Sequence, residues 1–166
     1  MTSVPRAGLA RRLAAVVYET LLLIALLLVA NFLLLPLVTP VHAGRALTLP
    51  DLAARTLLFC ALFVVAGLYF VGSWTGGRRT LAQKTWRLRL VARDGAALDY
   101  RRAFLRYATA WIGPALALGS YALLRPHGLG GAAWVLLTVG YLAAFVDPER
   151  QFLHDRIAGT RVVQER

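Results

Sequence analysis

A long apolar run at residues 13–35 constrains the fold of this chain more than any other feature. Roughly 20 apolar residues in a helix cross the ~30 Å hydrocarbon core of a bilayer, so the run predicts a membrane-spanning helix. The only full charge inside it is the carboxylate of Glu19. A charge within a span is costly in free energy, which points to a functional role or a specific partner for this side chain.

Three further apolar runs complete the predicted architecture. They cover residues 52–74, 103–124 and 130–146. Hydrophobic residues make up 58% of the chain, above the roughly 45–50% typical of soluble domains. We therefore predict an all-α membrane protein with four transmembrane helices in a single domain over residues 1–166. Pro114 is expected to kink the third helix, and a loop at 75–102 and a tail at 147–166 lie outside the spans.

The distribution of positive charge predicts the orientation. Sixteen of the 19 Lys and Arg residues lie near the N-terminus, between residues 78 and 106, or in the tail. With four spans these regions share one side, and the positive-inside rule places that side, with both termini, in the cytoplasm of an inner (plasma) membrane protein. The net charge of +11 then needs no nucleic acid. The expected partner is a bilayer with anionic headgroups, with a second copy of the chain or another membrane protein left open.

The loop between the second and third helices has a pattern of its own. Residues 86–90 alternate apolar and basic side chains, which is the period of a half-buried strand. Asp94 and Gly95 form a strong hairpin turn signal. Residues 97–98 could supply the return strand, and residues 161–163 a third one. We predict a small cytoplasmic β-hairpin between helices two and three.

Arg12 and Glu19 are the charges whose spacing is most informative. They are seven residues apart, so they share one face of a helix with a rise of about 10.5 Å between them. That separation is too long for a direct ion pair within one helix. A polar group from elsewhere in the chain must approach, and Asp155 in the tail is the candidate partner for Arg12.

These residues carry a resemblance to a known family. A basic pair is followed, seven positions after Arg12, by the acidic Glu19; residues 80–91 lead into an Asp-Gly turn; and residues 154–163 contain His-Asp and end in a Gly-Thr-Arg-Val stretch. The chain resembles the RDD family, small bacterial integral membrane proteins named for one arginine and two aspartates. Glu19 stands where the family has its first aspartate, a Tyr-Glu variant, and Asp155 matches the second.

The resemblance implies transport, with cation–proton exchange as the form proposed for some members. Glu19 would then bind the proton or cation, and Arg12 and Asp155 would tune its charge state. His154, Arg161 and Lys84, which belong to the matching motifs, would support the site.

An alternative is left open by the same residues. The chain could be a structural or accessory membrane subunit in which Arg12, Glu19 and Asp155 form a charge latch. In that case exchanging the charges of Arg12 and Asp155 is expected to restore part of the stability that either single change removes.

Other classes of function find no support in the sequence. There is no nucleophile beside a base, no pair of catalytic carboxylates and no phosphate-binding glycine loop, so we do not expect an enzyme. The single cysteine, Cys60, lies in an apolar run, and three histidines without further thiols make no metal-ligand set. No metal or cofactor is expected.

Overall fold

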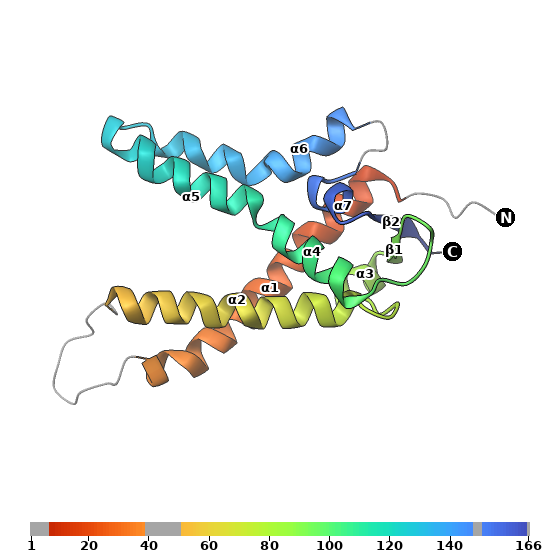
Figure 1. Cartoon of the computed structure of the whole chain (residues 1–166), viewed down its shortest axis with the longest axis horizontal. Coiled ribbons are helices and arrows are strands. Elements are labelled where there is room, and N and C mark those ends of the chain that lie inside the picture. Colours follow the sequence, from red (N-terminus) through yellow and green to blue (C-terminus); the bar gives the residue numbers. More distant parts are fainter. Residues whose placement is uncertain (1–6, 39–50, 148–150, 166) are drawn as a thin grey trace.

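The computed structural model describes residues 7–38, 51–147 and 151–165, and this part of the chain is mostly helical (Figure 1). Its elements, in chain order, are α1 (Leu9–Val38), α2 (Leu52–Trp74), α3 (Leu81–Thr85), β1 (Leu88–Ala92), α4 (Tyr100–Ala110), α5 (Ile112–Leu124), the 3-10 helices η1 (Arg125–His127) and η2 (Gly130–Thr138), α6 (Val139–Val146), α7 (Leu153–Ile157) and β2 (Thr160–Gln164).

The long helices form two pairs that extend from one shared region of the molecule. α1 packs on α2, α5 packs on η2, and α4 contacts α2 and α7. Figure 1 shows α3, α7 and both strands gathered near the start of α1, and shows α5 and α6 extending from there in a different direction from α1 and α2. We call this gathering of α3, β1, α7 and β2 the base.

The first two predicted spans are confirmed as helices. α1 and α2 are the two helices, among the described residues, that are long and apolar enough to cross a membrane. α2 has the predicted bounds, and the Asp51 side chain caps it by accepting a hydrogen bond from the Ala54 amide at 2.7 Å. Gly76 and Gly77, both with positive φ, follow its last turn and stop the helix.

The third predicted span is divided into two helices. α4 begins at Tyr100, its first turn capped by the Asp99 side chain, and it meets α5 at Trp111. Pro114 has no N–H to donate to the carbonyl of Ala110, and its ring crowds that carbonyl, so the α-helical ladder breaks where α4 ends. The predicted kink is therefore present as an interruption at Trp111, whose backbone stays in the αR region, and α4 carries the buried Arg106 into the base.

The fourth predicted span differs from an α-helix over its first half. Residues of η2 form a 3-10 helix of nine residues, and only α6 is α-helical. η2 lies against α5 so closely that a Cβ at Gly113 would come within 3.1 Å of the Leu137 carbonyl oxygen. Glycine at that position allows the backbones of the two elements to approach.

The predicted hairpin between helices two and three is wrong. The Asp94-Gly95 turn does form, with φ of +88° at Gly95 and the Asp94 side chain accepting from the Ala96 amide. β1, however, pairs antiparallel with β2, from Leu88 opposite Gln164 to Ala92 opposite Thr160. The strand predicted at residues 161–163 is therefore confirmed, as part of β2. The predicted return strand at residues 97–98 does not pair with β1. The carbonyl of Leu98 accepts a hydrogen bond from the Gly76 amide instead.

The packed core and the apolar surface lie in different parts of the molecule. A buried cluster forms where α2, β1 and α4 meet, and it includes Trp74, Leu90 and Tyr107. Beyond the base, large apolar side chains are exposed all along the helices, among them Leu21, Leu28, Phe32, Leu57, Leu68, Leu118, Leu123, Val135 and Phe145. Soluble monomers rarely expose contiguous apolar surface on this scale, whereas lipid covers it without cost. This surface and the two long apolar helices indicate a membrane protein.

Candidate functional site

The centre of the base is the carboxylate of Asp155, which is 0% exposed and is held by two arginines. Arg12 Nη2 lies 2.8 Å from Asp155 Oδ2. Arg106 Nε donates to Oδ1 at 2.9 Å, and its Nη2 lies 2.7 Å from the same oxygen. These contacts tie α1, α4 and α7 together, and we call Arg12, Arg106 and Asp155 the buried charge cluster.

Aromatic rings fix the orientation of both guanidinium groups. The Cζ atom of Arg12 lies 4.2 Å from the ring centroid of Phe152, and that of Arg106 lies 4.4 Å from the ring of Trp74. Attraction between a cation and the face of a ring adds to the ion pairs, and planar guanidinium is suited to both contacts at once.

The electrostatics of the base keep Asp155 ionised and His154 neutral. Burial by itself raises the pKa of Asp155, but Arg106 chiefly, with His154 and Arg12, more than offsets this, so that its pKa lies below the usual value. Burial lowers the pKa of the His154 imidazole to about 4, and Arg106 and Arg12 act in the same direction. At neutral pH the cluster therefore consists of two cations and one anion beside an uncharged imidazole.

Glu19 lies apart from this cluster and is held by hydroxyl groups. Tyr69 Oη donates to Oε1 at 2.6 Å, and Thr80 Oγ1 donates to Oε2 at 2.5 Å. Thr80 is also the N-cap of α3, in a capping box with Gln83, so the carboxylate of α1 positions the start of α3. The predicted three-residue latch is therefore wrong in one member, because hydroxyls take the place of an arginine at Glu19.

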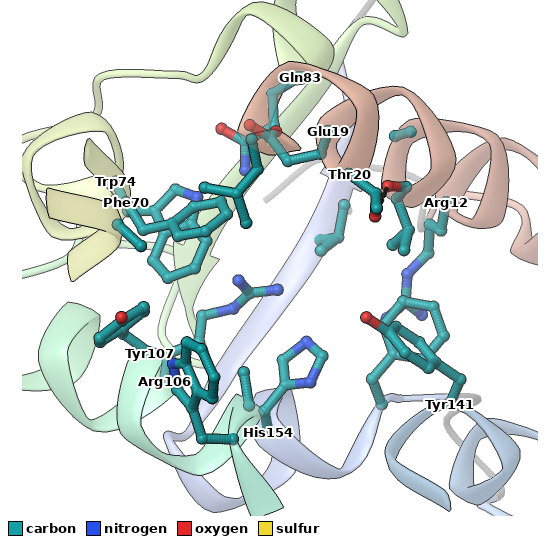
Figure 2. A pocket seen from close by; sticks show the side chains of 18 of the residues that line it. Arg12, Glu19, Thr20, Phe70, Trp74, Gln83, Arg106, Tyr107, Tyr141 and His154 are labelled. Carbon is teal, nitrogen blue, oxygen red and sulfur yellow. Dashed lines mark hydrogen bonds between the residues drawn. The ribbon is translucent and has the colours of Figure 1, made fainter. Parts of the chain in front are cut away.

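A cavity of about 280 Å³ separates Glu19 from the buried charge cluster. Its lining comes from all the α-helices and from both strands of the described chain. Figure 2 shows the guanidinium of Arg106 and the imidazole of His154 directed into the cavity. The walls between these polar groups are mostly aromatic: Phe70, Trp74, Tyr107 and Trp111. Mostly apolar walls with a few converging polar groups are typical of a ligand-binding cavity.

The structure brings together some of the residues that the sequence singled out and not others. Arg12, Glu19 and His154 line the cavity, and Asp155 lies behind it against the arginines. Lys84 is exposed on α3, and Arg161 lies on β2 opposite Val91; neither is part of the lining. In the described parts of the chain no group of three His, Cys, Asp or Glu residues could hold a metal ion.

Three residues of the site were missed from the sequence: Arg106, Tyr69 and Thr80. Arg106 was counted among the basic residues of the central loop, although it lies inside the apolar run at 103–124. The same reasoning that singled out Glu19, a lone charge in an apolar segment, would have found it. The two hydroxyls carry no such signal.

The sequence matches a known protein family over most of its length. The model of the RDD family matches residues 6–159 of this chain. The chain belongs to the RDD family. No curated protein and no solved structure matches it. In this RDD protein Arg12 and Asp155 form one ion pair, and Glu19 lines the same cavity as Arg12.

Proposed function

We propose that this RDD protein is a small transporter in which Glu19 carries a coupling proton or cation, rather than an enzyme. The observation that carries the proposal is the position of Glu19: its side chain, in an apolar helix, lines a cavity and forms no ion pair with any arginine that the structure describes. A carboxylate sealed against an arginine would stay ionised, as Asp155 does, whereas one at a cavity can exchange a proton or ligate a cation.

The partners of Glu19 suit a group that changes its charge. A hydroxyl both donates and accepts hydrogen bonds, so Tyr69 and Thr80 can satisfy the carboxylate and, after rotation of one O–H, its protonated form. Neither change requires the surrounding helices to move. Asp155 differs, because arginines only donate and therefore favour the ionised state alone.

The proposal predicts that Glu19→Gln abolishes flux in proteoliposomes. Glutamine keeps the size and the hydrogen-bonding oxygen but cannot take up a proton or hold a cation by charge. The measurement is pH-dependent cation uptake, read with an internal pH-sensitive dye across a panel of Na⁺, K⁺ and Li⁺. The matched control is Glu165→Gln, the same change at a residue that pairs with Arg79 outside the cavity. Equal flux in the Glu19 variant and the parent would remove Glu19 from the mechanism.

We further propose that the chain crosses the membrane four times, with both termini in the cytoplasm of the inner membrane. The 3-10 geometry supports the fourth crossing, because nine residues of η2 and eight of α6 rise about 30 Å in all, the thickness of the hydrocarbon core. Exposed apolar side chains on α5, η2 and α6 support the third and fourth crossings. Exposed arginines on α4, Arg101 and Arg102, would meet anionic headgroups on the cytoplasmic side.

This topology predicts opposite labelling of two engineered cysteines. In a Cys60→Ala background, Ala96→Cys lies in the turn after β1 and is expected to react with a membrane-impermeant maleimide only after the cells are opened. His127→Cys, in η1, is expected to react in intact spheroplasts. Both positions are exposed. Labelling of both cysteines from the same side would exclude four crossings.

A second candidate function, an accessory subunit whose charges serve only to hold the fold, is favoured by a different observation. Asp155 is completely buried between Arg12 and Arg106, which is the geometry of a structural tie between helices. Under this alternative Glu19→Gln lowers thermal stability and the parent shows no cation-dependent flux. The partner would then be a second copy of the chain or another membrane protein.

A further inference from the structure

The buried charge cluster leaves one nitrogen of Arg106, Nη1, without an acceptor among the described residues. Guanidinium carries five N–H donors, and in Arg106 both Nε and Nη2 are directed to Asp155. Nη1 makes no hydrogen bond to any residue that the structure describes. The residue is only 7% exposed, and its guanidinium points into the cavity (Figure 2). A cationic donor that faces a cavity and has no acceptor among the described residues is open to an acceptor group of a ligand.

Arg106 is held in the orientation that an incoming anion needs. Asp155 fixes the guanidinium along one edge, and the ring of Trp74 lies 4.4 Å beneath it. Because the side chain is already ordered, binding an acceptor at Nη1 requires little loss of conformational entropy.

The remainder of the cavity suits an apolar body. Phe70 stacks on Trp74 with ring centroids 4.8 Å apart, and Tyr107 meets Trp111 edge to face at 6.1 Å. These four rings form the walls next to Arg106. The volume of about 280 Å³ is at the small end of ligand cavities.

We propose that the cavity binds a small organic anion, with its carboxylate or phosphate group on Arg106 and its apolar body among the four rings. At the Arg106 end of the cavity, away from Glu19, a bare inorganic cation would leave these walls without a partner and would face the guanidinium groups of Arg12 and Arg106. The description of this anion as the transported substrate rests on the function proposed above; its binding does not.

The test is equilibrium binding to the full-length protein in dodecyl maltoside, measured by isothermal titration calorimetry. The probes are phenylacetate, 2-phenylethanol and phenethylamine, which share a body and differ in charge. Phenylacetate is expected to bind at least about tenfold more tightly than the other two, because a charge-assisted hydrogen bond to arginine contributes roughly 1.4 kcal/mol or more. Equal or tighter binding of phenethylamine would overturn the proposal.

Two variants separate loss of the site from loss of the fold. Arg106→Lys keeps a positive charge beside Asp155, but a lysine has no second nitrogen that could bind the ligand while the first binds Asp155. The affinity for phenylacetate is therefore expected to fall about tenfold. Ala110→Phe places a ring in the cavity from α4 and leaves every residue of the buried charge cluster unchanged, and binding should be lost. The control is Arg102→Gln, an exposed arginine on the same helix, which should bind as the parent does. Unchanged affinity in both cavity variants would refute the site.

A lipid could supply the same chemistry, and a second arm of the experiment distinguishes this source. Protein purified from membranes is analysed for retained phosphatidylglycerol and fatty acid by mass spectrometry, and phenylacetate titrations are repeated after delipidation. If a lipid occupies the site, anionic lipid is retained by the parent and the Arg102 control but lost from Ala110→Phe. Absence of both phenylacetate binding and retained anionic lipid would overturn the proposal. Neither arm uses a gradient, so the flux result for Glu19→Gln can fail independently.

Discussion

Asp155→Asn is expected to lower the free energy of unfolding by about 3–5 kcal/mol, the usual cost of removing one partner of a buried ion pair. The side chain is 0% exposed and it serves two arginines, so the neutral amide leaves both guanidinium groups buried with less compensation. Asparagine matches aspartate in size, which keeps the packing of the base constant. For a chain of this length the loss corresponds to a fall in Tm of roughly 10 °C.

The measurement is tryptophan-fluorescence thermal unfolding in detergent, supported by size-exclusion chromatography. Asp94→Asn makes the same chemical change at an exposed turn where the nearest arginine nitrogen is 3.9 Å away, so its Tm should stay close to that of the parent. If the two variants were equally stable, Asp155 would not be the residue that ties α1 and α4 to α7.

The features of the fold that depend on local sequence were predicted well. The length of an apolar run and the residues that end it fix α2 at residues 52–74, and the Asp94-Gly95 pair forms its turn. Pro114 was expected to kink the third span, and the helix is interrupted at Trp111, between α4 and α5. The strand at residues 161–163 was predicted, but the strand that pairs with β1 was not: local pattern favoured the nearer residues 97–98 after the Asp94-Gly95 turn, whereas β1 pairs with the sequence-distant β2.

The candidate site, like the fold, could be predicted from the sequence only in part. Helical spacing and the family motif together pointed to Arg12 and Asp155 as partners, which lie 143 positions apart and are in contact. The partners of Glu19 could not be predicted, since Tyr69 and Thr80 come from other elements, 50 and 61 positions away, and uncharged hydroxyls in apolar or mixed segments carry no distinctive pattern. Only the folded structure shows that the Glu19 carboxylate is held by Tyr69 and Thr80 and not by Arg12 or Arg106.

The presence of Arg106 in the cluster reverses the sequence-based expectation for exchanging two charges. With Arg12 and Asp155 as an isolated pair, the double variant Arg12→Asp, Asp155→Arg would recover stability. In the structure an arginine at position 155 would lie against Arg106, which approaches the present carboxylate to 2.7 Å. Two cations at that distance in a buried site repel strongly, so the double variant should lose more than about 5 kcal/mol or fail to fold.

The same unfolding assay checks this outcome, and a third change identifies its cause. Adding Arg106→Gln to the double variant removes the repelling cation while its amide can still accept a hydrogen bond from the arginine at 155. Stability is therefore expected to rise from the double to the triple variant, whereas Arg102→Gln, added in its place, should give no recovery. A double variant as stable as the parent would show that Arg12 and Asp155 act as an independent pair. Recovery specific to the loss of Arg106 would instead establish that one carboxylate holds two helices, α1 and α4, against the tail.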